Sequence, residues 1–298
     1  MCVHVCARVR ACVCKCVRMC VDTTLTPWAG CSPAGCAQVP LWNEKNREYV
    51  MIGEDYGVSL SSYTSPSPLG PFTKKQDLAP VFGLPADSTT FVDDDGTAYL
   101  IYNSRRGAVP QRFTYVYRFN DDYTDIVPSS MANTTTVMEG LWMVKRSGTY
   151  YLFGSPLKGY GDSDDFYLTA PAPLGPWTPR GLIAPAGSRT FDSQVFRGLE
   201  VSGPKGTAHV MIMTRWCNPY PPSGSCVPPF RNTTSIWLPL SFNPDGSIVK
   251  LKWVVIRLTT GHSTPTAPRT GVLYQFSLML RLLGRDLARR GRVQAMLL

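Results

Sequence analysis

Short runs of aromatic and aliphatic residues, each preceded by a polar turn, recur along the middle of the chain. Four such runs lie at residues 47–51, 96–100, 148–152 and 206–210, with starts 49, 52 and 58 residues apart. A second marker, SPLGPFT at residues 67–73, returns as APLGPWT at 172–178. Repeating sheet units of about fifty residues predict a β-propeller, whose blades cover one another's faces. A β-sandwich with coincidental turns is the alternative fold.

The unit at residues 137–177 shows the pattern most clearly. Glu139 stands at the head of an apolar strand, a polar turn follows at residues 146–148, and a β-rich run occupies residues 149–153. This order predicts a small antiparallel sheet with a carboxyl group at its inner start. We expect Glu139 to project toward the centre that the units share.

Two further turns are legible in the sequence. Asp93-Asp94-Asp95-Gly96 separates two strand-like runs, and its glycine can adopt the positive φ of a tight hairpin turn. Three adjacent aspartates also suggest calcium, but no EF-type loop with a later bidentate glutamate follows them. We therefore expect a turn here, and a second one at residues 243–247.

Composition agrees with an all-β domain. The 298 residues include 25 Gly and 26 Pro, and only 17% are charged, which is typical of short strands joined by many turns. The net charge of +9 lies at the ends, since residues 1–20 carry +4 and residues 254–298 carry +6. The remainder is close to neutral, so no phosphate-binding groove is expected and nucleic acid is not a predicted partner.

The two ends differ from the body in composition. Residues 1–35 form a low-complexity Cys/Val/Arg segment without the paired spacing of a zinc site, and we expect neither a fold nor a metal there. This segment also lacks the apolar core and cleavage site of a signal peptide. Residues 254–298 form a basic Leu/Arg tail whose arginines interrupt any membrane span. An amphipathic surface helix and translated non-coding sequence are both open interpretations of the tail.

Two features favour the secretory pathway. Cys217 and Cys226 flank a turn-rich loop that a disulfide could close in an oxidising compartment. Two glycosylation sequons begin at Asn133 and Asn232.

Three stretches of the body carry a family resemblance. They are DSTTFVDDDGTAYLIY at residues 87–102, EGLWMVKRSGTYY at 139–151 and TFDSQ at 190–194. In order and spacing they resemble glycoside hydrolase family 43, and within it the exo-β-1,3-galactanase branch. The resemblance covers residues 40–253 and implies a five-bladed β-propeller that cleaves glycosidic bonds with inversion. About four blades are visible, and the Cys/Val/Arg segment stands where the family's first blade would be.

The resemblance implies roles for three polar residues. Glu139 matches the general acid, and we expect the apolar Leu141, Trp142 and Met143 to surround it and raise its pKa. Asp87 matches an aspartate that tunes the acid and holds a sugar hydroxyl, although an Asp-Ser-Thr segment also makes turn caps. Gln194 matches a glutamine that orients the attacking water, although a buried amide can simply pair with the backbone.

Aromatic residues are expected to form the sugar platform. By the same resemblance, Tyr56, Tyr160 and Trp216 line the pocket, where a flat ring can stack on galactose. Two departures from the family pattern stand out: Lys158 replaces a small hydroxyl residue, and residues 103–106 lack an expected acidic residue.

The predicted function is removal of terminal β-1,3-linked galactose from a polysaccharide or oligosaccharide by a monomeric, cofactor-free glycosidase. A catalytically impaired propeller that binds glycans or proteins is an alternative from another class. A sialidase- or fructosidase-like enzyme on the same architecture is a third interpretation.

Overall fold

The computed structural model describes residues 40–55, 59–79, 81–83, 85–104, 113–203, 206–224, 226–227 and 233–253. Both predicted terminal segments, as well as Tyr56 and Asn232, lie outside these residues. Within them the chain is all-β, with four antiparallel sheets of four strands each. No helix in the described ranges has the length and apolarity that a membrane crossing requires.

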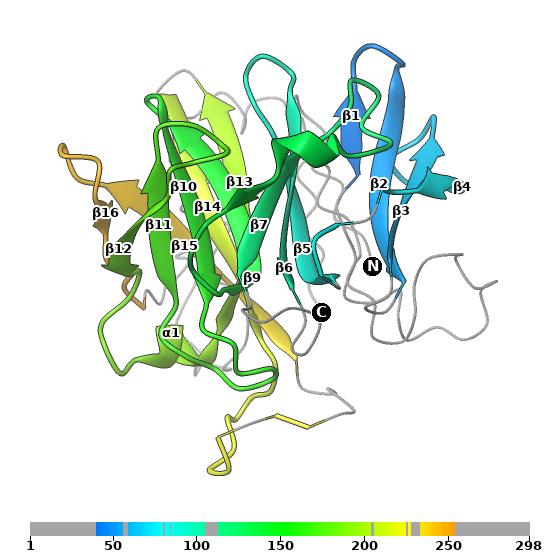
Figure 1. The fold of residues 1–298 in the computed structure, drawn as a ribbon. Coiled ribbons are helices and arrows are strands. Elements are labelled where there is room, and N and C mark those ends of the chain that lie inside the picture. The colour runs from blue at the N-terminus through cyan, green and yellow to red at the C-terminus, as the bar shows by residue number, and fades with distance from the viewer. Residues whose placement is uncertain are drawn as a thin grey trace, which may run out of the picture.

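Each sheet is built from four strands that are consecutive in sequence (Figure 1). The first sheet contains β1 (Leu41–Asn43), β2 (Glu48–Asp55), β3 (Ser59–Ser65) and β4 (Thr73–Asp77). The second contains β5 (Pro85–Val92), β6 (Ala98–Ser104), β7 (Thr114–Arg118) and β8 (Ala132–Asn133). The third contains β9 (Glu139–Arg146), β10 (Thr149–Ser155), β11 (Phe166–Ala170) and β12 (Thr178–Leu182). The fourth contains β13 (Gln194–Gly203), β14 (Gly206–Arg215), β15 (Thr234–Phe242) and β16 (Ile248–Val249). Two helical turns, η1 (Pro128–Ser130) and α1 (Arg189–Asp192), lie in the connections.

The predicted turns are confirmed. Asp93 and Gly96 close the β5–β6 hairpin, where Gly96 has φ +84° and donates its N–H to the Asp93 carbonyl at 3.0 Å. Ser147 and Gly148 both have positive φ between β9 and β10, as a tight hairpin turn requires. The β15–β16 turn at residues 243–247 closes in the same way, with the Asn243 N–H on the Ser247 carbonyl at 2.8 Å.

Alternation along the strands explains how the sheets pack. Successive side chains of a strand point to opposite faces, so a sheet between two others needs apolar residues on both. On β6, Leu100 packs toward the first sheet and Ile101 toward the third. On β9, Met143 packs toward the second sheet and Val144 toward the fourth. These strands are therefore apolar almost throughout.

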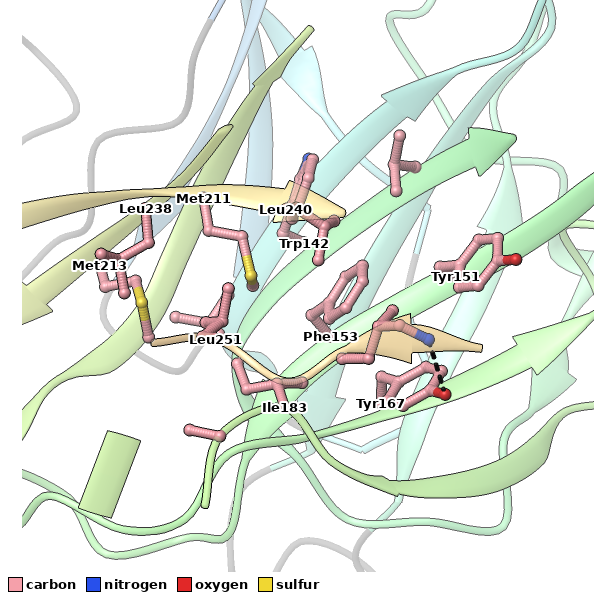
Figure 2. Packing of buried hydrophobic residues seen from close by; sticks show 14 of the residues in the cluster. Trp142, Tyr151, Phe153, Tyr167, Ile183, Met211, Met213, Leu238, Leu240 and Leu251 are labelled. Atoms are coloured by element: carbon pink, nitrogen blue, oxygen red, sulfur yellow. Dashed lines mark hydrogen bonds between the residues drawn. The ribbon is translucent and has the colours of Figure 1, made fainter. Parts of the chain in front are cut away.

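Three apolar clusters result, one between each pair of neighbouring sheets. Figure 2 shows the cluster between the third and fourth sheets, where Trp142, Phe153 and Tyr167 lie with Met211 and Met213. The Trp142 and Phe153 rings stack at a centroid separation of 5.2 Å. Backbone hydrogen bonds join the strands within each sheet, whereas these apolar layers hold neighbouring sheets together.

The first strands of the later sheets meet one another. β9 contacts both β5 and β13, which places the beginnings of three sheets side by side. The contact between β9 and β13 requires a glycine, because a Cβ on Gly198 would lie 1.9 Å from Trp142 Cζ2. The indole of Trp142 therefore lies directly on the Gly198 backbone.

This contact generates a stability prediction. Gly198→Ala should destabilise the protein by about 1–3 kcal/mol, because the added methyl displaces a large ring in a packed core. Urea unfolding of both proteins measures the loss. In the background of Trp142→Phe, which shortens the ring, the same glycine substitution should cost less. Equal costs in the two backgrounds would show that Trp142 is not what restricts residue 198.

Candidate active site

The three polar residues predicted for the site converge on Gly140. Glu139 is the first residue of β9, Gln194 is the first residue of β13, and Asp87 lies on β5. The Gly140 N–H donates to Asp87 Oδ2 at 3.0 Å. A Cβ on Gly140 would lie 2.8 Å from Gln194 Cγ and 2.3 Å from the Val195 carbonyl oxygen. Asp87 and Gln194 therefore both contact the residue that follows Glu139.

Glu139 is half-buried, and its carboxylate is oriented by the backbone. Glu139 Oε1 accepts a hydrogen bond from the Lys158 N–H at 2.7 Å. The Lys158 side chain is exposed, so its departure from the family pattern does not remove this contact. The three apolar residues expected around Glu139 do not share one face of β9. Leu141 and Met143 pack between the second and third sheets, and Trp142 packs toward the fourth, because the strand alternates.

Ser155 connects Glu139 to Gln194 and was missed in the sequence. Ser155 Oγ donates to the Glu139 carbonyl oxygen at 3.2 Å and accepts from Gln194 Nε2 at 2.8 Å. The other end of the amide, Gln194 Oε1, accepts from Trp216 Nε1 at 3.0 Å. Only the pairing of Ser155 opposite Glu139 in the β9–β10 ladder could have revealed it.

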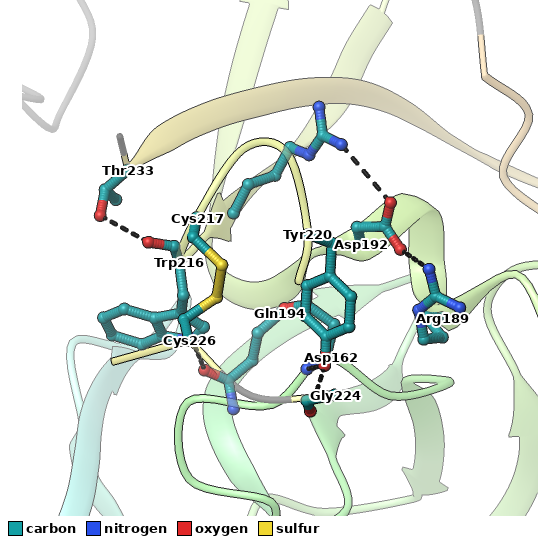
Figure 3. The surroundings of a disulfide bond; sticks show 11 residues. Asp162, Arg189, Asp192, Gln194, Trp216, Cys217, Tyr220, Gly224, Cys226 and Thr233 are labelled. Carbon is teal, nitrogen blue, oxygen red and sulfur yellow. Dashed lines mark hydrogen bonds and ion pairs between the residues drawn. A yellow bond between two sulfur atoms is a disulfide. The ribbon is translucent and has the colours of Figure 1, made fainter. Parts of the chain in front are cut away.

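The predicted aromatic residues Tyr160 and Trp216 lie together, with ring centroids 5.2 Å apart in an edge-on arrangement. Cys217 and Cys226, which the sequence allowed to pair, form a disulfide, and it lies next to Trp216 (Figure 3). The Cys226 N–H donates to the Tyr160 carbonyl at 3.0 Å. The disulfide therefore braces both rings at the side of Gln194.

The residue before Glu139 is also fixed by polar contacts. Asn103 Nδ2 donates to the Met138 carbonyl at 2.8 Å, and the Met138 N–H donates to Thr114 Oγ1 at 3.1 Å. Asn103 lies in the segment where an acidic residue was expected, and here its amide positions the entry into β9. Arg105 and Arg106, from the same segment, lie outside the described residues.

The turn leading into Gln194 is left-handed. Residues 189–192 all have φ between +48° and +63°, a conformation that costs on the order of 1–2 kcal/mol for each non-glycine residue. Polar contacts hold it in place. The Arg189 N–H donates to Asp164 Oδ1 at 2.7 Å, and buried Thr190 Oγ1 donates to the Ser163 carbonyl at 3.0 Å. Asp192 pairs with the guanidinium groups of Arg189 and Arg215.

Two buried carboxyl groups lie behind this turn. Asp165 Oδ2 accepts the Val195 N–H at 2.8 Å, which fixes the backbone beside Gln194. Burial raises the pKa of Asp165 well above its ordinary value. Burial, and then the Asp192 carboxylate, raise the pKa of Asp162 to about 7, against the opposing effect of Arg215. Neither oxygen of Asp162 has a hydrogen-bond partner among the described residues.

The described part of the chain contains no group of three or more His, Cys, Asp or Glu side chains arranged to hold a metal ion. The site combines two carboxyl groups with an oriented amide. The Asp87 carboxylate accepts the Gly140 N–H, and Ser155 links the Gln194 amide to the Glu139 carbonyl oxygen. Such a set can protonate one atom of a substrate while it positions a water molecule elsewhere.

Comparisons with known proteins place these features in a family context. The family model described as glycosyl hydrolases family 43 matches residues 44–162. A curated β-D-galactofuranosidase of Aspergillus niger is 30% identical over 164 residues, which are 50% of this chain and 45% of that protein. The chain therefore spans less than half the length of that relative.

Two solved structures are similar over most of the chain. The exo-β-1,3-galactanase of Phanerochaete chrysosporium, solved with galactose, is 28% identical with a TM-score of 0.57, and the match covers 73% of this chain and 49% of that one. A Bifidobacterium bifidum protein provisionally named an exo-β-1,3-galactanase is 26% identical with a TM-score of 0.61. That match covers 75% of this chain and 73% of the bifidobacterial chain.

The buried Asp162 generates a pH prediction. Because its folded pKa of about 7 lies above the ordinary 3.8, the folded protein holds a proton that the unfolded chain releases between these values. Stability from this group is therefore present at low pH and is lost as the pH rises toward 7. Asp162→Asn keeps the shape without the charge, so it should raise the Tm relative to wild type, and the rise should be larger at pH 8 than at pH 5.

The matched control is Asp121→Asn, because the Asp121 side chain is 86% exposed. This substitution should leave the Tm close to that of wild type at both pH values. The same Tm difference between Asp162→Asn and wild type at pH 5 and pH 8 would show that Asp162 does not titrate in this window.

Proposed function

Because residues 44–162 match the model of glycosyl hydrolases family 43, we propose that this chain belongs to that family and removes terminal β-1,3-linked galactose from galactan side chains, with inversion at the anomeric carbon. The convergence of Asp87, Glu139 and Gln194 on Gly140 carries this proposal. The similarity to an exo-β-1,3-galactanase solved with galactose supports the substrate class.

The proposed architecture is a β-propeller of the five-bladed type. The four sheets are four of its blades, and their first strands β5, β9 and β13 line the central axis. Packing of apolar clusters between neighbouring sheets supports it, since propeller blades are covered in this way. A fifth blade would lie between the first and fourth sheets. Residues 40–253 form the catalytic domain.

Glu139 is the general acid. It protonates the oxygen of the leaving sugar, which is a poor leaving group without that proton. The Lys158 N–H on Oε1 supports this role because it fixes the direction in which the carboxyl group faces. Asp87 accepts the N–H of Gly140, the residue that follows the acid, and it holds a sugar hydroxyl.

Gln194 positions the water that attacks from the opposite face of the sugar. An inverting enzyme leaves roughly 6.5–9.5 Å between its two groups so that the water fits. An amide is a poor base, but an amide fixed by Ser155 and Trp216 can orient a water molecule. Tyr160 and Trp216 form the sugar platform. The Cys217–Cys226 disulfide supports a secreted location.

The proposal predicts a dependence on the leaving group. Glu139→Gln keeps the size of the side chain but removes the acidic proton, so kcat/KM on β-1,3-galactan should fall by roughly 10²–10⁴. An aryl β-galactopyranoside should lose far less, because a phenolate leaves without much protonation. Steady-state rates on both substrates measure the difference. Gln194→Ala should slow both substrates alike, since it acts on the water.

Glu44→Gln serves as the control, because Glu44 is exposed, and both rates should stay unchanged. Equal loss on both substrates for Glu139→Gln would contradict the acid role. Aryl β-galactofuranoside tests the chemistry of the Aspergillus niger relative, and faster turnover of that sugar would overturn the substrate class. A wild-type protein that binds galactan without hydrolysing it would instead support a glycan-binding module.

A further inference from the structure

We propose that Trp216 is a positioning residue for Gln194: together with Ser155, its indole N–H sets which end of the Gln194 amide faces the attacking water. The inference rests on the proposed function, because it assigns to Gln194 the water side of the reaction. It goes further in assigning the orientation of the amide to two neighbours. It also gives Trp216 a second task besides stacking on a sugar.

The donors and acceptors around the amide leave one orientation. The Trp216 indole N–H is a donor only, and it lies 3.0 Å from Gln194 Oε1. The Ser155 hydroxyl has a single proton, which it donates to the Glu139 carbonyl oxygen at 3.2 Å. While its proton lies on that carbonyl, Ser155 Oγ accepts from the amide, and it does so from Gln194 Nε2 at 2.8 Å. A flipped amide would point an N–H group at the indole N–H, and its oxygen could be paired only if the Ser155 hydroxyl gave up its bond to the Glu139 carbonyl.

Counting the donors and acceptors of the Gln194 amide shows which of them remain for a water molecule. A glutamine amide has two acceptor sites on its oxygen and two N–H donors. Trp216 uses one acceptor site and Ser155 uses one donor, and the Gln194 side-chain amide makes no other hydrogen bond within the described residues. One N–H and one lone pair thus remain for water. A water held by both has a defined orientation, which a freely rotating amide would not impose.

Trp216 is itself held rigidly enough for this task. Its carbonyl oxygen accepts from Thr233 Oγ1 at 2.9 Å. The next residue, Cys217, is bonded to buried Cys226, whose N–H donates to the Tyr160 carbonyl at 3.0 Å. Figure 3 shows Trp216 and Gln194 on the same side of this disulfide, with the indole directed toward the amide. The disulfide and these hydrogen bonds hold the Trp216 backbone, and with it the indole N–H, in place.

A double-mutant cycle tests the inference. Trp216→Phe keeps an aromatic ring but removes the N–H, so kcat on an aryl β-galactopyranoside should fall by about five- to tenfold, the loss expected for one hydrogen bond. In the Gln194→Ala background the same substitution should change kcat by less than about twofold, since no amide is left to orient. Ser155→Ala should show the same dependence on Gln194.

The cycle separates this role from a stacking or structural one. A residue that only stacks on the sugar would raise KM in both backgrounds, and a residue that only stabilises the fold would lower kcat and Tm in both. Either result would overturn the proposal. Trp42→Phe is the matched control, because Trp42 packs on Tyr49 in the first sheet, and its kcat should equal that of wild type.

A second readout does not depend on turnover. The indole ¹H–¹⁵N resonance of Trp216, assigned from its absence in Trp216→Phe, should shift upfield in Gln194→Ala as the hydrogen bond is lost. An unchanged resonance would overturn the proposal. If Gln194→Ala leaves kcat unchanged, the proposed water role of Gln194 fails, and this inference fails with it. If Gln194→Ala lowers kcat and Trp216→Phe lowers it equally in both backgrounds, only the positioning role fails.

Discussion

The absence of a side chain at Gly140 is the constraint on which the candidate site depends. A Cβ there would lie 2.3 Å from the Val195 carbonyl oxygen, and the backbone has φ +62°, which favours glycine. Any larger residue would separate the start of β9 from the start of β13. Because Glu139 and Gln194 are the first residues of these strands, that separation would part the proposed acid from the proposed water-positioning amide. The Gly140 N–H meanwhile connects Asp87 to the same point.

The fold explains why these residues meet at strand beginnings. Apolar clusters between the sheets fix the strands along their length, and alternation fills both faces of the inner sheets. Glu139 and Gln194 lie outside these clusters, at the first positions of their strands. β9 lies between β5 and β13, so its first residues are within reach of two other sheets. The apolar core and the polar site are consequences of the same packing.

Much of this arrangement could be predicted from the sequence, because it depends on local signals. The glycine turns at Gly96 and Gly148, the strand that Glu139 begins and the four sheet units all have local patterns. The disulfide was left open by the sequence, and only the spatial approach of Cys217 and Cys226 decides it. Leu141, Trp142 and Met143 do not surround Glu139 together, because alternation puts Trp142 on the face opposite Leu141 and Met143.

Contacts between distant residues could not be predicted. Ser163-Asp164-Asp165 reads locally as an exposed polar turn, yet Asp165 is buried and accepts the Val195 N–H from 30 residues away. Ser155 reads as the unremarkable end of a strand, and its importance comes from the two residues that it connects. The left-handed turn at residues 189–192 has no glycine to announce it. Such features have no periodicity, so no sequence pattern predicts them.

The features that the sequence does not predict lie in the segments that lead to Gln194 or pack against its backbone. The left-handed turn leads into Gln194, buried Asp165 accepts the next N–H, and the unpartnered Asp162 carboxyl lies close enough to Asp192 of the turn to be repelled by it. Each of these features opposes the stability of the fold. Only Phe191 of the turn packs against an apolar cluster within the described residues. A sequence selected for stability alone would place glycines in the turn and apolar residues at the buried carboxyls. The turn and the hydrogen bond from the Val195 N–H to Asp165 fix the backbone at Gln194, so the position of the proposed water-positioning amide is what these costly features provide.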